Sequence, residues 1–225
     1  MGAKPNPKRK AALLGAFVAY VLKNGLSDLS LRPAAAALRT SPRMLLYHFG
    51  SKEDLIVAAI AEARTRELQL FARAAQKWGE TSPVQAFRRI WGFYTAPSRR
   101  PYLRFFFEVY GLALQNPDKY PEFLRTVGSD FLGYTASALV ANGISERHAA
   151  PLASLHIASI RGLLMDLMTT GDRARVDAAA QMVADSLDAE LRLARARRDR
   201  RSGRATPRTA ARGRRRRTRA VRSSL

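Results

Sequence analysis

The chain contains no cysteine and only three histidines, His48, His148 and His156. Without thiols it has neither a disulfide scaffold nor a thiolate metal site, and histidines so far apart offer little material for a zinc site. It also lacks a nucleophile paired with a base and a glycine-rich phosphate loop. The sequence therefore predicts a protein that is not an enzyme and that uses no metal or cofactor.

Long apolar runs are missing as well. The stretch from Ala11 to Leu22 follows a basic segment and resembles the start of a signal peptide. It is well short of the ~20 residues that a membrane-spanning helix needs. No small-residue cleavage site follows it, because Lys23 comes next. We therefore expect a cytoplasmic protein with no membrane association.

Acidic residues are scarce at both ends of the chain. Residues 1–50 hold eight Lys or Arg against one Asp, and residues 195–225 hold fourteen Arg against one Asp. Residues 51–194 are nearly balanced, with seventeen basic and sixteen acidic side chains. Basic ends attract polyanions, because each neutralised phosphate releases counterions. The charge pattern therefore predicts a polyanionic partner, a class that includes double-stranded DNA.

A first helix is predicted from about Pro7 to Asn24. Its leucines, valines and phenylalanine recur at i, i+1, i+4, i+5 and i+8, which is typical of a buried helical stripe. Gly25 follows directly, and glycine takes the left-handed C-cap conformation at least cost. We interpret this helix as a packing element with a basic leading end.

Two short helices separated by a tight turn are predicted next. Ser30 is the expected N-cap of the first, Leu31–Leu38. Ser41 is the expected N-cap of the second, with Pro42 at its first position, where the missing N–H of proline costs little. A capping box that begins at Ser51 then starts a long helix. This order of elements is typical of a helix-turn-helix DNA-binding unit.

The stretch from Leu13 to Asp54 resembles the DNA-binding region of the tetracycline-repressor (TetR) family of transcriptional regulators. The segment LLGAFVAYVLKNG matches the first helix of that family, and YHFGSKEDL matches its YxHFxSKexL signature. Arg39 occupies a turn position where the family usually has Gly. This departure predicts either a left-handed Arg39 or a turn built differently.

The resemblance implies an all-α protein with three parts. Residues 1–54 would form a three-helix helix-turn-helix domain with a basic N-terminal arm. Residues 55–194 would form a helical bundle for ligand binding and dimerisation. Residues 195–225 are rich in arginine, poor in apolar side chains and interrupted by glycine and proline, which predicts disorder. Whether this tail binds DNA, binds another acidic partner or reflects only coding bias is left open by the sequence.

The candidate DNA contacts lie on and around the second short helix. Residues near the start of a recognition helix meet base edges in the major groove, where Arg43 can pair with guanine and Met44 can contact a thymine methyl. The family resemblance assigns Tyr47, His48 and Lys52 mainly to the phosphate backbone. A plainer alternative is that His48 and Lys52 are ordinary surface side chains. The full candidate set is Arg32, Thr40, Ser41, Pro42, Arg43, Met44, Tyr47, His48 and Lys52.

The middle of the chain shows no persistent strand-like alternation, and its turn signals separate five or six predicted helices. Members of the family bind a small molecule inside this bundle, so we expect an unidentified small hydrophobic ligand. Aromatic side chains at helical spacing are also the usual material of an ordinary core. The candidate ligand contacts are Phe87, Trp91, Tyr94, Arg104, Phe105, Phe106, Glu108, Tyr110, Phe131, Tyr134 and His156.

The last two predicted helices, Ala149–Met168 and Arg173–Ala194, carry more apolar residues than one subunit easily covers. The resemblance implies that they dock onto a second copy as a four-helix bundle. We therefore expect a homodimeric transcriptional regulator, most simply a repressor, that binds a near-palindromic operator and is released by its ligand. The alternative is a nucleoid-type architectural DNA-binding protein whose middle domain only dimerises.

Overall fold

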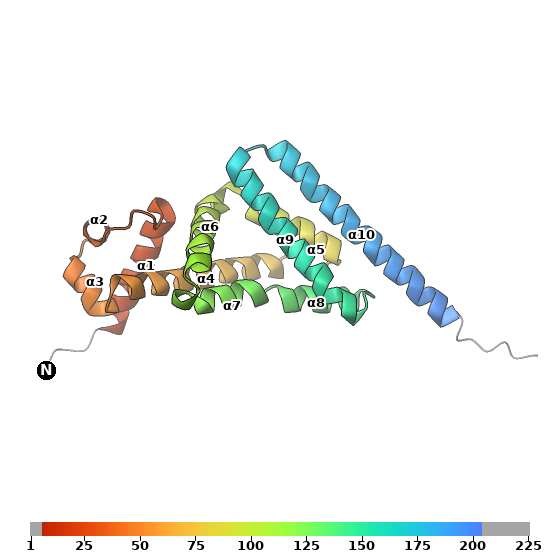
Figure 1. Cartoon of the computed structure of the whole chain (residues 1–225), viewed down its shortest axis with the longest axis horizontal. Helices are drawn as coiled ribbons and strands as arrows, with labels where there is room; N and C mark the ends of the chain where they lie inside the picture. The colour runs from red at the N-terminus through yellow and green to blue at the C-terminus, as the bar shows by residue number, and fades with distance from the viewer. Residues whose placement is uncertain (1–5, 204–225) are drawn as a thin grey trace, which may run out of the picture.

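The computed structural model describes residues 6–203, and within this range every regular element is helical. The predicted all-α class is confirmed. Helices α1, α2 and α3 gather at one end of the molecule, and α4 runs from them into the remaining bundle (Figure 1). The elements are α1 Pro7–Asn24, α2 Leu31–Ala37, α3 Pro42–Phe49, α4 Lys52–Gln76, α5 Pro83–Tyr94, the 3-10 turn η1 Pro97–Arg99, α6 Arg100–Gln115, the 3-10 turn η2 Pro117–Lys119, α7 Pro121–Ser129, α8 Leu132–Ala141, α9 Glu146–Thr170 and α10 Arg173–Gly203.

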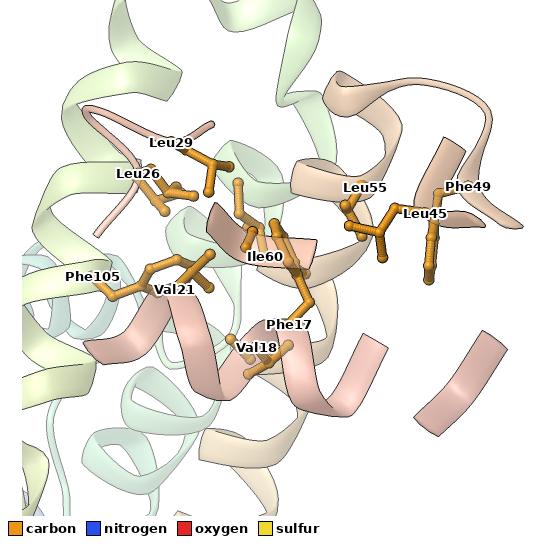
Figure 2. Packing of buried hydrophobic residues seen from close by; sticks show 14 of the residues in the cluster. Phe17, Val18, Val21, Leu26, Leu29, Leu45, Phe49, Leu55, Ile60 and Phe105 are labelled. Atoms are coloured by element: carbon orange, nitrogen blue, oxygen red, sulfur yellow. The ribbon is translucent and has the colours of Figure 1, made fainter. Parts of the chain in front are cut away.

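The first core joins the helix-turn-helix to the helices that follow it. Phe17 of α1, Leu45 of α3 and Leu55 of α4 are fully buried. Phe105 and Val109 of α6 belong to the same cluster, and Figure 2 shows side chains of these helices converging. Burying a large apolar side chain contributes about 1.5–3 kcal/mol. The core of the helix-turn-helix therefore extends well past residue 54 into α6.

The helix ends agree with most of the local predictions. Ser41 accepts a hydrogen bond from the Met44 N–H at 3.2 Å, and Ser51 accepts one from the Asp54 N–H at 2.9 Å. The Ser30 side chain, by contrast, makes no cap hydrogen bond. Gly25 has the expected positive φ of 82°, but its ψ of −174° is extended rather than left-handed helical. The chain therefore leaves α1 in an extended direction.

Arg39 in the turn between α2 and α3 has a φ of 52°, the single positive value outside glycine in residues 6–203. The first of the two possibilities considered for this residue is therefore the correct one. A left-handed conformation costs an L-residue with a Cβ about 1–2 kcal/mol. The turn thus holds a local strain that glycine would remove.

A second core lies among α5, α8, α9 and α10. Leu139, Ala153 and Val176 are almost completely buried within it. Four of the apolar side chains on the last two helices are buried within the chain itself, namely Leu164, Val176, Leu187 and Leu191. The apolar residues of α10 do recur at helical spacing, as predicted. Helix α5 packs against α10 and covers much of this apolar stripe.

Helix α10 continues through Gly203, so the prediction of disorder from residue 195 is wrong for 195–203. Alanine and arginine are good helix formers, and the helix extends beyond its last buried residue, Leu191. The remainder of the predicted tail, 204–225, lies outside the described residues.

Candidate functional site

Helix α3 presents one face to its neighbours and the other to solvent. Leu45 and Phe49 are buried against the core, whereas Ser41 and Arg43 are exposed. Met44 is partly buried on the border between the two faces. The exposed face therefore holds Arg43 at the N-terminal end of the helix, where a recognition helix meets base edges.

Other basic groups lie close to this face. Arg32 on α2 is exposed, and Lys52 at the start of α4 is half-buried. The Lys10 ammonium lies 5.2 Å from the centre of the Phe49 ring, which places the basic start of α1 beside the end of α3. Such a grouping of cations can follow a phosphate backbone.

Polar atoms of two predicted DNA contacts, His48 and Thr40, are buried. The His48 ring is 5% exposed, and neither ring nitrogen has a hydrogen-bond partner in the described structure. The ring lies against Tyr47, with the ring centres 5.2 Å apart. The Thr40 hydroxyl is likewise buried without a partner. Both polar groups are therefore shielded from solvent, whereas Tyr47 is 45% exposed.

Ser41 and Pro42 have structural roles at the start of α3. The Ser41 hydroxyl is engaged as the N-cap, and Pro42 occupies the first turn. Their position at the leading end still places their backbone at the outer face. That Ser41 and Pro42 contact bases remains a prediction.

A cavity of about 540 Å³ lies in the second half of the molecule, with walls from α4, α5, α6, α8 and α9. Pockets that hold drug-sized ligands have volumes in this range. Six of the predicted ligand contacts line it: Phe87, Tyr94, Phe106, Phe131, Tyr134 and His156. The structure thus brings together aromatic residues from four helices and from the short α7–α8 junction.

The other five predicted ligand contacts lie elsewhere. The Trp91 Nε1–H donates to Asp177 at 2.7 Å, beside α10. Phe105 is buried in the first core, and Tyr110 packs against Phe123. Arg104 is exposed, and Glu108 binds a loop. None of these five is among the residues that line the cavity in the described structure: Trp91, Arg104, Phe105, Glu108 and Tyr110.

Glu108 connects α6 to the loop that follows α1. Its Oε1 atom accepts hydrogen bonds from the Leu26 N–H at 2.8 Å, the Ser27 N–H at 2.7 Å and the Ser27 hydroxyl at 2.6 Å. The sequence did not indicate this contact, because the partners are more than eighty positions apart. It ties the helix-turn-helix to a wall of the cavity.

Polar groups gather in one part of the cavity lining. Arg64 of α4 forms an ion pair with Asp130 at 2.7 Å. Arg161 of α9 donates to the backbone carbonyl of Val127. Burial lowers the pKa of Arg161, and the nearby charge of Arg64 adds to this effect. Burial raises the pKa of Tyr94, so its phenol is neutral.

The sequence analysis did not select Arg64, Asp130 or Arg161. Arg161 was detectable in principle, because a single arginine in the apolar stretch LASLHIASIRGLL needs a partner or an opening. The pairing of Arg64 with Asp130 joins α4 to the α7–α8 junction across sixty-six positions and leaves no local signal. In residues 6–203 we find neither a cluster suited to a metal ion nor a helix long and apolar enough to cross a bilayer.

No family model and no curated protein matches the sequence. Solved structures do match. A TetR-family regulator from Rhodococcus sp., assigned as putative, is 18% identical with a TM-score of 0.60, over 83% of this chain and all of that chain. A transcriptional regulator from Saccharomonospora viridis in complex with choline is 20% identical with a TM-score of 0.62, over 81% of this chain and 97% of the other.

The multidrug binding protein EbrR, complexed with imidazole, is 20% identical with a TM-score of 0.59, over 82% of this chain and 93% of its own. Further EbrR structures in complex with proflavin and ethidium also match. The chain therefore has the fold of TetR-family regulators, and the resemblance seen in the sequence is confirmed at the level of the fold.

Proposed function

We propose that this chain is a TetR-family transcriptional regulator, most simply a repressor, that binds a near-palindromic operator as a homodimer. A small molecule in the cavity releases it from DNA. One observation carries the proposal: α4 and α6 line the cavity and also form the core of an exposed helix-turn-helix. A ligand that shifts either helix therefore changes the position of α3.

The outer face of α3 supports the DNA-binding part of the proposal. Arg43 is exposed near its N-terminal end, and further cations lie on the adjoining elements: Lys10 beside Phe49, Arg32 on α2 and Lys52 at the start of α4. A bidentate Arg–guanine pair contributes about 1–3 kcal/mol of discrimination between bases. These further cations add binding that does not depend on sequence.

Exposed apolar side chains on α9 and α10 support the dimer. Leu155 and Met165 of α9 are 59% and 52% exposed, and Met182 and Leu193 of α10 are 74% and 51% exposed. On both helices the intervening exposed positions include small residues, such as Gly162. Small residues allow two helices to approach closely, and a second copy would cover both stripes. A two-fold dimer places two recognition helices about one DNA turn, ~34–36 Å, apart.

The contact between Glu108 and the α1–α2 loop supports the coupling of ligand to DNA binding. On α6, Tyr102 and Phe106 line the cavity, whereas Phe105 and Val109 belong to the core around α1. The same helix holds the loop before α2 through Glu108. Movement of α6 would therefore be passed on to the helix-turn-helix.

Selection of bound fragments from random double-stranded DNA tests the proposal. Enrichment of one palindromic sequence, lost in Arg43→Ala, is the expected result. Binding without enrichment would favour the nucleoid-type alternative. Release by a ligand is tested separately, by adding compounds to the preformed complex and measuring fluorescence anisotropy of the labelled DNA.

A further inference from the structure

The charges that line the cavity do not balance. The charged lining residues are Arg64, Asp130 and Arg161. Arg64 and Asp130 are paired at 2.7 Å, while the Arg161 guanidinium makes its hydrogen bond to a neutral carbonyl, that of Val127. Within residues 6–203, no carboxylate lies within ion-pair distance of Arg161. The cavity therefore holds one uncompensated positive charge.

That charge lies in an apolar setting. Most of the other lining side chains are aromatic or aliphatic, including Phe71, Phe87, Phe106 and Phe131. Taking an unpaired cation out of water is unfavourable, and an anion brought to it in such a setting gains more than in bulk water. The electrostatics of the site thus favour an anionic ligand over a cationic one.

A second unsatisfied group lies on the same helix. His156 is 5% exposed, and its Nδ1 lies 2.7 Å from the Leu152 carbonyl oxygen. A carbonyl only accepts, so Nδ1 carries the hydrogen and Nε2 of the neutral ring is an acceptor. Nε2 is buried without a partner. A ligand hydroxyl that donates to Nε2 would satisfy it.

From these two groups we infer that the cavity binds an aromatic carboxylate that also carries a hydroxyl, with the carboxylate on Arg161 and the hydroxyl donating to His156. The two residues are five positions apart on α9, a rise of about 7.5 Å. The ligand therefore needs its polar groups at opposite ends of an apolar body. The inference rests on the proposed function, because it names the ligand class of the same cavity.

Cationic ligands fit these charges poorly. Asp130 is the acidic residue among the described residues of the lining, and Arg64 already neutralises it. Glu67 is paired with Arg99 at 3.2 Å and does not line the cavity. Dyes such as proflavin and ethidium, which EbrR binds, would meet Arg161 without an offsetting carboxylate.

Isothermal titration calorimetry of the full chain, without DNA, tests the inference with 6-hydroxy-2-naphthoate as the ligand. Three comparison compounds are titrated in the same way: its carboxamide, which lacks the negative charge; 2-naphthoate, which lacks the hydroxyl; and proflavin, which is a cationic dye. We expect the carboxylate to bind roughly 10- to 100-fold more tightly than the carboxamide, the range for hydrogen bonds to a charged group. Equal binding of the two, tighter binding of proflavin, or no binding of 6-hydroxy-2-naphthoate would each overturn the inference.

Substitutions locate the two contacts. Arg161→Gln should remove the preference for carboxylate over carboxamide, and Arg161→Lys should retain part of it. Arg192→Gln, at an exposed arginine of α10, is the matched control and should change nothing. His156→Phe should remove the advantage of 6-hydroxy-2-naphthoate over 2-naphthoate. If Arg161→Gln fails to fold, the affinities of the carboxylate and the carboxamide for the unchanged protein and for Arg161→Lys still test whether Arg161 binds the carboxylate.

The outcome is separable from that of the proposed function. If the chain selects a palindromic DNA sequence but shows no preference for the carboxylate, the proposed function stands and this inference fails. If the chain binds the carboxylate through Arg161 but selects no DNA sequence, this inference stands and the proposed function fails.

Discussion

Glu108 of α6 accepts two hydrogen bonds from Ser27, one from its N–H at 2.7 Å and one from its hydroxyl at 2.6 Å. A third comes from the neighbouring Leu26 N–H. A carboxylate that accepts from backbone N–H groups forms stronger hydrogen bonds than a neutral acceptor. The loop before α2 is therefore fixed by a residue of α6, the helix that also lines the cavity.

Glu108→Ala should lower the free energy of unfolding by about 1–3 kcal/mol, because two backbone N–H groups lose a charged acceptor. Urea unfolding followed by circular dichroism measures this change. Glu122→Ala is the control, since Glu122 lies at the surface and pairs with the exposed Arg125, and such pairs contribute little. Equal effects of the two substitutions would show that the loop does not depend on Glu108.

Arg39→Gly should raise the free energy of unfolding by up to about 1 kcal/mol, since glycine adopts a positive φ without the cost that a Cβ imposes. Arg39→Ala keeps the strain and removes only the guanidinium. Comparing operator binding of the two variants separates conformation from charge. Weaker binding in both would show that Arg39 contacts DNA, whereas unchanged binding would show that the strain is simply tolerated.

Arg43→Ala should weaken binding to the selected operator by about 1–3 kcal/mol and leave binding to unrelated DNA less affected. Lys52→Ala should weaken both similarly and reduce the salt dependence by about one counterion. Electrophoretic mobility shifts at several salt concentrations measure these effects. Lys119→Ala, at an exposed lysine of η2, is the control. A uniform loss in Arg43→Ala would contradict its role in reading bases.

Met182→Glu should convert the proposed dimer to monomers, because it places a charge in the proposed apolar interface, where it has no partner. Met182 is 74% exposed in the single chain. Leu114→Glu makes the same kind of change at a residue of α6 that is 61% exposed and lies outside the α9–α10 face. Sedimentation velocity distinguishes the species. A dimer that survives Met182→Glu would place the interface elsewhere.

Glu67 should make stability depend on pH. The residue is 3% exposed, and burial raises the pKa of its carboxyl group above the ordinary value of 4.5, against the opposing charge of Arg99. Just above pH 4.5, the Glu67 carboxyl group is therefore protonated more often in the folded chain than in the unfolded chain. The contribution of Glu67 to the free energy of unfolding then falls as the pH rises through this range. Glu67→Gln removes the titrating group.

The free energy of unfolding of the unchanged protein, minus that of Glu67→Gln, should therefore decrease from about pH 4 to pH 7. Chemical denaturation at several pH values gives this difference, in which the other titrating groups cancel. A difference that rises with pH would mean that Arg99 outweighs burial.

Local features of the fold could be predicted from sequence, and distant pairings could not. The caps at Ser41 and Ser51 depend on residues three positions away, so the sequence indicates them directly. The partners of Trp91 and Glu108 lie more than eighty positions away. Helical period marks a side chain as buried but does not say which neighbour buries it. For this reason the sequence predicts Phe105 and Trp91 as cavity residues, whereas in the structure both belong to the hydrophobic cores.

The same reasoning applies to His48. The family motif places His48 in the last turn of α3, and the sequence offers no means of deciding which way its ring turns. The structure turns the ring inward, where both nitrogens are unpaired. Its burial follows from the packing of α3 on its neighbours and not from the motif.

On α6, Phe105 is buried in the core of the helix-turn-helix, while the next two residues, Phe106 and Phe107, line the cavity. If the cavity is enlarged to accept a new compound, α6 should therefore be left unchanged, since substitutions there also disturb the packing of the helix-turn-helix. Helices α8 and α9 line the cavity at a distance from the helix-turn-helix. Substitutions on those two helices should change which compounds the cavity accepts while leaving the helix-turn-helix intact.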